Sequence, residues 1–187
     1  MDAPPRLLDR EFWFLRHGQT DWNLDNLAQG RTDIALNAAG VAQARAAAAS
    51  LRGRGISRIH ASTLMRARVT AEIVGHALDL PVATDPDLQE VAFGAREGQV
   101  MLAPWFGAWV AGQATPEGAE SFAEVTARAV AAVNRSLTAP GLCLIVAHGG
   151  MFRGLRAAMG LDPGMRIANG VALLCRPGAT WELLPAG

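Results

Sequence analysis

Short apolar runs alternate along the chain with longer segments in which alanine or apolar residues recur at helical spacing. A continuous apolar run such as residues 12–15 is typical of a strand that is buried on both faces of a sheet. Six strands are expected, over residues 12–16, 58–61, 82–84, 142–147, 171–175 and 181–184. A turn at Pro177 and Gly178 joins the last two strands, which predicts an antiparallel hairpin at one edge of the sheet.

Helix-capping residues precede several of the longer segments. Asn37 can cap one helix, and Ser62 or Thr63 can cap the next. Ser121 and Glu124 have the spacing of a capping box at the start of a third helix. With their caps, four helices are expected over about residues 37–52, 62–78, 119–137 and 149–159.

The alternation of strands and helices predicts a three-layer α/β/α fold with a mostly parallel central sheet of about six strands. A single domain over residues 1–187 is expected, because no repeat, low-complexity linker or composition break marks a second one. Residues 100–118 form the least regular segment. We expect a cap-like excursion there, with one short helix begun by Pro104.

Charge and composition narrow the possible partners. The chain has 17 basic and 17 acidic residues, no Lys, and a sequence pI of about 6.9. Without a basic tract, neither nucleic acid nor a membrane is expected as a partner. Cys143 and Cys175 lie inside apolar segments, so neither a disulfide nor a metal cluster is expected. The amino terminus lacks the apolar region of a signal peptide, so we expect a cytoplasmic protein.

Polar residues with catalytic potential follow three of the predicted strands. Arg16 and His17 end the first strand, Arg66 begins the helix after the second, and His148 and Gly149 follow the fourth. If these strands are parallel, their carboxyl ends open onto one edge of the sheet, where ligands of α/β proteins bind. Backbone N–H groups at the start of the last helix can approach an anion there. The combination predicts a phosphate-sized anion site.

Transfer of a phosphoryl group from an alkoxide also needs an acid that protonates the leaving oxygen. Glu90 can reach the same edge and is the first candidate, with Glu97 as the second. A zinc site formed by His17, His148 and Glu90 is conceivable. The flanking arginines argue against zinc, because they repel a dication and attract an anion.

The chain resembles the histidine phosphatase superfamily, also called the phosphoglycerate mutase-like family. The resemblance covers nearly the whole chain and implies the family's α/β/α fold. Segments that recur in the family's order are LRHGQTDWN, QGRTDIALNAAGVAQA, ASTLMRARVTAEIV, LQEVAFGAREG, PEGAESFAEVTARA and VAHGGMFRGL.

The resemblance implies a role for each matching residue. His17 would be the nucleophile that becomes a phosphohistidine. Arg16, Arg66 and His148 would hold the phosphoryl oxygens, and Glu90 would be the general acid and base. Neither a metal nor another cofactor is implied. The positions that match the lining of the substrate or phosphate pocket are Thr20, Asn23, Gln29, Gly30 and Gly149.

Three functions remain open at this point. Phosphoglycerate mutases need several cations, some of them supplied before the third helix, yet residues 97–127 contain no basic residue. This favours a metal-independent phosphatase acting on a phosphomonoester of a small metabolite. A mutase or phosphotransferase, and a non-catalytic protein that binds a phosphorylated ligand, are the alternatives.

The aromatic residues of the excursion allow two interpretations. Trp105, Phe106 and Trp109 either pack the excursion onto the domain or hold an apolar or ring-bearing leaving group. An exposed aromatic surface could equally serve a homodimer. Arg96 stands where the family often has an aromatic residue, so we expect a differently shaped or charged pocket wall there.

Overall fold

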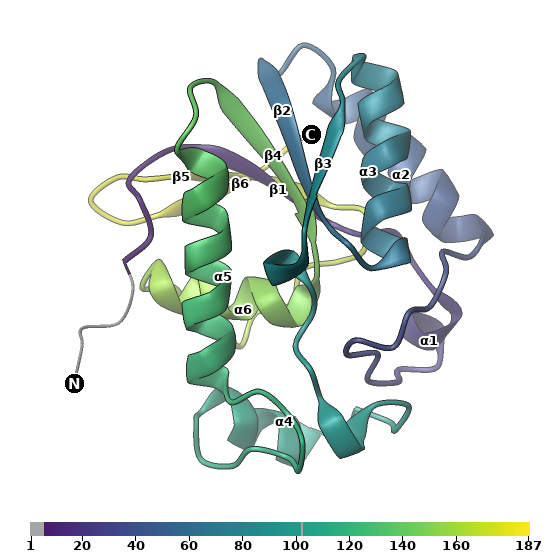
Figure 1. Cartoon of the computed structure of the whole chain (residues 1–187), viewed down its shortest axis with the longest axis vertical. Helices are drawn as coiled ribbons and strands as arrows, with labels where there is room; N and C mark the ends of the chain where they lie inside the picture. The colour runs from purple at the N-terminus through teal and green to yellow at the C-terminus, as the bar shows by residue number, and fades with distance from the viewer. Residues whose placement is uncertain (1–5, 102) are drawn as a thin grey trace.

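A six-stranded sheet forms the centre of the computed structural model, which describes residues 6–101 and 103–187 (Figure 1). The order across the sheet is β3-β2-β4-β1-β5-β6. The first four strands in this order are parallel, and β5 and β6 form an antiparallel hairpin at one edge, as predicted. The strands are β1 Phe12–Arg16, β2 Ile56–Ser62, β3 Val82–Asp85, β4 Leu142–Ala147, β5 Ala172–Arg176 and β6 Glu182–Pro185.

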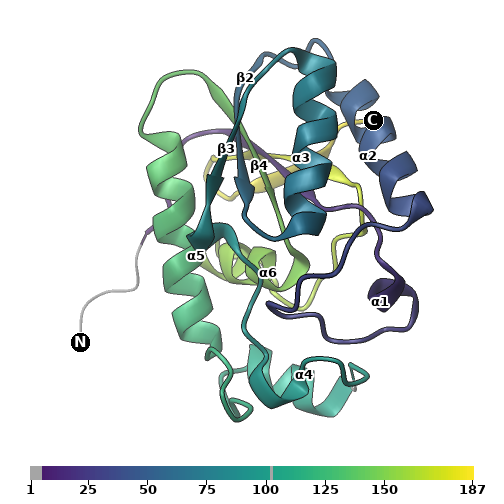
Figure 2. The same cartoon turned by 45° about the vertical axis from the view of Figure 1, so that its right-hand side comes forward.

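Helices cover both faces of the sheet, which confirms the three-layer α/β/α prediction (Figures 1 and 2). Successive side chains of β1 point to opposite faces. Phe12 and Phe14 pack against α5 and α6, whereas Trp13 and Leu15 pack against α2 and α3. The helices are α1 Asp21–Leu24, α2 Ala38–Leu51, α3 Met65–Leu78, α4 Ala103–Val110, α5 Phe122–Leu137 and α6 Gly149–Ala158.

Two of the predicted helix caps are confirmed and one is wrong. Asn37 caps α2, and Ser121 caps α5 in a full capping box with Glu124. Neither Ser62 nor Thr63 caps α3. That helix begins at residue 65 with no side-chain cap on its preceding residue. The Ser62 hydroxyl is instead bound to the ring of a histidine in the site described below.

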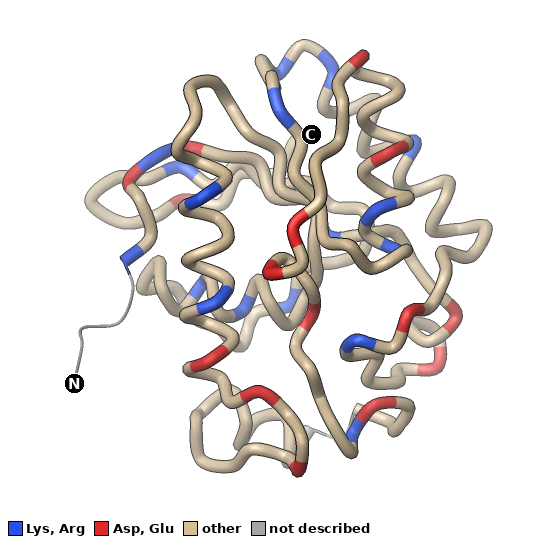
Figure 3. The backbone as a smooth tube through the Cα atoms, in the orientation of Figure 1, with Lys and Arg blue, Asp and Glu red and all other residues tan. Residues whose placement is uncertain are grey.

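The excursion forms the short helix α4, which lies beyond the lower end of the sheet in Figures 1 and 2. It packs onto the domain through an apolar cluster that includes Phe93, Trp109 and Val125. Charged residues are interspersed over the backbone (Figure 3). Among the described residues, no helix is long and apolar enough to cross a membrane.

Candidate active site

The three strand ends expected to carry the chemistry meet at one edge of the sheet. Strands β1, β4 and β2 are adjacent and parallel, so His17 and His148 follow neighbouring strands. The centroids of their rings are 5.2 Å apart. Arg66 lies in the first turn of α3, directly after β2. The topology alone therefore brings these side chains together.

A cavity of about 320 Å³ opens at this edge, within the size range of small-molecule pockets. Of the ten candidate site residues, His148 and Thr20 do not line it. The imidazole of His148 is completely buried beside His17. The candidates that line the cavity are Arg16, His17, Asn23, Gln29, Gly30, Arg66, Glu90 and Gly149.

The imidazole of His17 is held in one tautomer. Its Nδ1 lies 2.7 Å from the carbonyl oxygen of Gly18. Since a carbonyl oxygen only accepts hydrogen bonds, Nδ1 carries the proton and Nε2 keeps its lone pair. Burial, together with the charges of Arg66 and Arg16, lowers the pKa of His17 well below its usual value. The ring is therefore neutral near pH 7, with a nucleophilic Nε2.

The imidazole of His148 is oriented by Ser62. Its Nε2 lies 2.8 Å from the Ser62 hydroxyl, which also accepts a hydrogen bond from the amide of Leu64 at 3.2 Å. Because a buried hydroxyl proton needs an acceptor, Ser62 donates to Nε2, and the ring proton is on Nδ1. Burial and the charge of Arg66 lower the pKa of His148 well below its usual value. The Nδ1 atom of this neutral ring is buried without a partner among the described residues.

Arg16 and Arg66 are buried cations tied to backbone carbonyls. Arg66 donates to Gly30 at 2.7 Å and to Thr32 at 2.9 Å, and Arg16 donates to Ile167 at 2.6 Å. Within the described part of the chain, the Nε atoms of both arginines are buried without a partner. Burial lowers the pKa of Arg16 to about 10, so it remains charged at neutral pH. Buried donors without partners are consistent with an anion site.

The carboxylate of Glu90 binds the amino-terminal amides of α6. Its Oε1 accepts from the amides of Val91 at 2.9 Å and Met151 at 2.8 Å, and its Oε2 accepts from Gly150 at 3.0 Å. The amide of Gly150 is one of the N–H groups at the start of the last helix that were expected to approach an anion, but it binds Glu90 instead. A Cβ on Gly150 would lie 2.7 Å from Oε1, so this approach requires glycine. One acceptor position remains on Oε2 for a proton.

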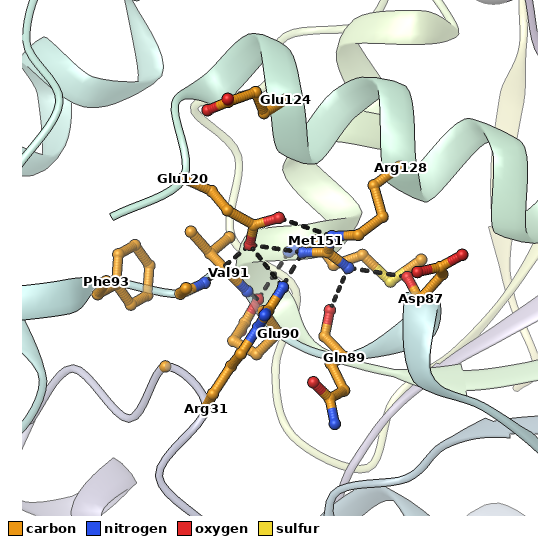
Figure 4. Close-up of polar contacts among 12 residues, drawn as sticks. Arg31, Asp87, Gln89, Glu90, Val91, Phe93, Glu120, Glu124, Arg128 and Met151 are labelled. Carbon is orange, nitrogen blue, oxygen red and sulfur yellow. Dashed lines mark hydrogen bonds and ion pairs between the residues drawn. The ribbon is translucent and has the colours of Figure 1, made fainter. Parts of the chain in front are cut away.

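A network behind Glu90 fixes the backbone that carries it (Figure 4). Arg128 of α5 forms an ion pair with Glu120 at 2.7 Å. The same guanidinium donates to the carbonyl oxygens of Asp87 and Gln89, both at 2.8 Å, and to that of Glu90 at 3.3 Å. These contacts hold Glu90 against the helix terminus without touching its carboxylate.

Thr20 and Asn23 support the cavity in different ways. Thr20 was expected to line the pocket, but it caps the short helix α1 and is buried outside the cavity. The Oδ1 of Asn23 accepts from the amide of Thr20 at 3.1 Å and from Asn169 at 3.0 Å, which leaves its Nδ2 for the cavity. Asn169 also donates to the carbonyl oxygen of His17 at 3.1 Å. Sequence reasoning missed Asn169, because it lies in an irregular segment.

The loop at Gln29 and Gly30 is held by Glu97. The Glu97 carboxylate accepts from the amides of Arg31 and Thr32, both at 3.0 Å. Gly30 has φ +53°, and a Cβ there would collide with the Glu97 carboxylate. Glu97, the second candidate acid, does not line the cavity. Its contacts give it a structural role in shaping the loop.

The excursion contributes one of its three aromatic side chains to the cavity wall. Trp109 is completely buried and donates from Nε1 to the carbonyl oxygen of Glu120 at 2.8 Å. Phe106 lines the cavity, whereas Trp105 and Trp109 pack the excursion. Arg96 lies over the ring of Trp105, 5.6 Å from its centroid, and does not form the pocket wall that was expected to differ there.

Two further arginines line the cavity and were missed in the sequence. Arg153 lies on α6, and Arg166 lies in the irregular segment before β5. The spacing of four residues between Gly149 and Arg153 was the available signal, because residues i and i+4 share a helix face. No comparable spacing in the sequence indicated that Arg166 would line the cavity.

Other reactive side chains lie outside the cavity. Cys143 and Cys175 are free and buried, and burial raises the pKa of Cys143 to about 11. The described residues contain no group of three or more His, Cys, Asp or Glu side chains that could hold a metal ion. The conceivable zinc site at His17, His148 and Glu90 is therefore not formed.

The arrangement defines a class of protein that binds and transfers phosphoryl groups: a neutral imidazole with an available Nε2, two buried arginines and a carboxylate around one cavity. Comparison with known proteins gives the family. The family model for the histidine phosphatase superfamily (branch 1) matches residues 12–175. The chain belongs to this superfamily, so the predicted family and the prediction of a histidine-phosphatase-type enzyme are confirmed.

Curated relatives carry a mutase name. "Probable phosphoglycerate mutase GpmB" of Yersinia enterocolitica is 37% identical over 166 residues, which cover 82% of this chain and 76% of the relative. The protein of the same name from Proteus mirabilis is 35% identical over 151 residues, which cover 74% of this chain and 69% of the relative. Sequence similarity therefore links the chain to proteins named as mutases.

Solved structures of similar proteins include a phosphatase. A mycobacterial glucosyl-3-phosphoglycerate phosphatase complexed with VO3 has a TM-score of 0.81 and 32% identity, with 93% of this chain and 97% of that chain covered. The protein TTHB049 from Thermus thermophilus has a TM-score of 0.78 and 31% identity, with 94% of this chain and 99% of that chain covered. The phosphoglycerate mutase-like fold is thereby confirmed.

Proposed function

We propose that the protein is a metal-independent phosphatase that hydrolyses a phosphomonoester of a small metabolite through a phosphohistidine on His17. The observation that carries this proposal is the hydrogen bond from His17 Nδ1 to Gly18, which leaves Nε2 unprotonated beside two buried arginines. The similarity to a solved phosphatase supports hydrolysis. The arginines and the His148 N–H supply the electrostatic stabilisation that a metal ion would otherwise provide.

In the first step, His17 Nε2 attacks the phosphorus atom and the bond to the ester oxygen breaks. Glu90 gives the proton on Oε2 to the leaving oxygen, so the alcohol departs neutral. Arg16, Arg66 and the His148 N–H stabilise the charge on the transferring phosphoryl oxygens. The products of this step are the free alcohol, a phosphohistidine and the Glu90 carboxylate.

In the second step, the Glu90 carboxylate takes a proton from a water molecule that attacks the phosphorus atom. The N–P bond breaks, inorganic phosphate leaves, and the neutral imidazole of His17 is restored. Glu90 is again protonated, so the cycle closes without a cofactor. Three amides at the amino terminus of α6 and at Val91 fix its position, and they stabilise the carboxylate that forms in the first step and acts as the base in the second.

A phosphotransferase that moves phosphate between hydroxyl groups is the second candidate. Residues 97–127 lack basic side chains, but Arg153 and Arg166 add cations to the cavity from other elements. The similarity to relatives named as mutases also favours a phosphotransferase. A mutase would convert one phosphate ester into another without net release of inorganic phosphate.

Phosphate release from a panel of phosphomonoesters in the presence of chelator tests the proposal. The wild type is expected to release phosphate, His17→Ala to release none, and the control His76→Ala, at an exposed site on α3, to match the wild type. Isomerised ester without release would favour the mutase. Release that needs a metal ion, or that survives His17→Ala, would contradict the proposal.

A further inference from the structure

We propose that Gln43 is a positioning residue, which keeps the proton of His17 on Nδ1 by holding the peptide group that follows Gly18. The inference rests on the proposed function, because it concerns the imidazole that becomes phosphorylated there. Gln43 lies on α2, is partly exposed and does not line the cavity. It therefore acts on His17 through the backbone and not through the substrate.

Two hydrogen bonds in series connect Gln43 to the imidazole of His17. The group between them is the peptide bond that joins Gly18 to Gln19. Its N–H donates to the Oε1 of Gln43 at 2.8 Å, and its carbonyl oxygen accepts from His17 Nδ1 at 2.7 Å. Because hydrogen bonds in a chain polarise one another, a peptide group that donates through its N–H has a more strongly accepting carbonyl oxygen. Gln43 thus strengthens the hydrogen bond that sets the tautomer of His17.

Close packing of α2 against this loop confines the Gln43 side chain. A Cβ on Gly18 would lie 2.2 Å from the carbonyl oxygen of Gly40, and a Cβ on Gly40 would lie 2.1 Å from that of Gln19. Since Gly40 and Gln43 are three residues apart on one helix, they share the face that meets the loop. The backbone of Gly170 also packs closely on this side chain, because a Cβ there would lie 2.6 Å from the Cβ of Gln43. These contacts keep Gln43 beside the peptide group that it binds.

Asn169 holds the same peptide group from a different segment of the chain. Its Nδ2 lies 3.4 Å from the carbonyl oxygen of Gly18 and 3.1 Å from that of His17. These contacts do not depend on Gln43. Removal of the Gln43 oxygen should therefore weaken the hydrogen bond to Nδ1 without releasing the loop.

The tautomer of His17 determines how much of the enzyme can react. A neutral imidazole carries its proton on one of two nitrogens, and only the form protonated on Nδ1 leaves Nε2 free to attack. When the hydrogen bond to Nδ1 weakens, a larger fraction of the protein carries the proton on Nε2 and does not react. Such a change lowers kcat and leaves KM nearly constant, because Gln43 does not line the cavity.

Two substitutions at Gln43 test the role of its oxygen. Gln43→Met replaces the acceptor by an apolar side chain of similar length, and we expect kcat to fall roughly fivefold, with KM within about twofold. Gln43→Glu restores an acceptor oxygen and should recover most of kcat. Arg45→Met, at an exposed site on the same helix, is the matched control and should match the wild type. With folding checked by urea denaturation, an unchanged kcat in Gln43→Met or an equal loss in Gln43→Glu would overturn the role.

Imidazole ¹⁵N NMR separates this proposal from the proposed function, because it needs no turnover. The chain has four histidines, so the spectrum of His17→Ala identifies the His17 signals. Near neutral pH, the wild type and Gln43→Glu should show the proton on Nδ1, and Gln43→Met should show a mixture of tautomers. That mixture supports the role of Gln43 even if no ester is hydrolysed. A proton fully retained on Nδ1 in Gln43→Met would overturn it while leaving phosphatase activity intact.

Discussion

The inner and outer parts of the cavity are built by different means. The inner part is lined by Arg16, His17 and Arg66, with His148 directly behind His17, and all four are buried and lie within a residue or a helical turn of a strand end. The outer part includes Phe106, Arg153 and Arg166, which come from a short helix, the middle of α6 and an irregular segment. Sheet topology fixes the inner part, whereas packing between distant segments fixes the outer part.

This difference suggests that the inner part of the cavity determines the chemistry and the outer part determines substrate selectivity. In the proposed function, the inner part binds the phosphoryl group, which all phosphomonoesters share, and parallel strand ends determine its position. In the same proposal, the outer part contacts the rest of the substrate, and its residues are placed by packing between α4, α6 and an irregular segment. Changes in the inner part should therefore affect every substrate, and changes in the outer part should affect some substrates more than others.

The largest expected effect comes from Arg66. Arg66→Gln removes a buried cation from the phosphoryl site and should lower kcat/KM about 10³-fold for every ester, because transition-state charge loses its stabilisation. Arg68→Gln is the control, since Arg68 pairs with Glu72 at 2.8 Å outside the cavity. Steady-state kinetics on a well-folded variant checks this. A loss of less than tenfold, or a loss confined to a single ester, would contradict the assignment of the inner part of the cavity to the phosphoryl group.

A smaller effect is expected from Ser62, which acts through His148. Ser62→Ala removes the hydroxyl that keeps the His148 proton on Nδ1, so the donor to the phosphoryl group is no longer fixed. We expect about a tenfold loss in kcat with little change in KM, and substantial recovery in Ser62→Thr. Unchanged kcat in Ser62→Ala would show that the tautomer of His148 does not matter.

The two aromatic residues of α4 distinguish packing from pocket shape. Phe106→Leu should alter KM by a few-fold in an ester-dependent way, because Phe106 lines the cavity. Trp109→Phe should leave KM unchanged but lower the free energy of unfolding by about 1 kcal/mol, through loss of the hydrogen bond to Glu120. Kinetics and urea denaturation on both variants check this. The reverse pattern would assign the pocket role to Trp109.

An effect of similar size is expected on stability at acid pH. The folded pKa of His148 lies well below its usual value of 6.5, so the unfolded chain binds the proton first as pH falls. The contribution of the neutral ring to the free energy of unfolding is complete above pH 6.5. It declines by about 1.4 kcal/mol per pH unit below that, until the folded pKa is reached.

Urea denaturation of the wild type and His148→Gln between pH 7.5 and 5.5 measures this contribution. The difference in free energy of unfolding between the two proteins should shrink by about 1.4 kcal/mol per pH unit below 6.5. Carboxylates titrate in both proteins, so their effect cancels. A constant difference would mean that His148 keeps an ordinary pKa in the folded state.

Much of the fold could be predicted because its signals are local. The strands 12–16 and 142–147 were predicted to the residue, since a continuous apolar run ends abruptly at a polar residue in each. The capping box of α5 was equally local. The start of α3 was missed because its first amide donates to Asp33, a residue 32 positions away that no local pattern reveals.

The site could be predicted as a set of residues but not as a set of contacts. Parallel strand ends place His17 and His148 together from the sequence alone. Whether the amide of Gly150 binds an anion or Glu90 depends on how the segment after β3 packs against α6, which involves residues 60 positions apart. The role of Arg166 could not be predicted for the same reason, because its position follows from tertiary packing.

The most direct test of the mechanism is a rapid-mixing experiment with Glu90→Gln and p-nitrophenyl phosphate. This leaving group needs no protonation, so His17 should be phosphorylated, whereas hydrolysis without the base should be slow. The proposed mechanism predicts a burst of about one equivalent of p-nitrophenolate per protein and an acid-labile, alkali-stable phosphoryl group on His17. No burst from a folded protein, or label on another residue, would contradict the account.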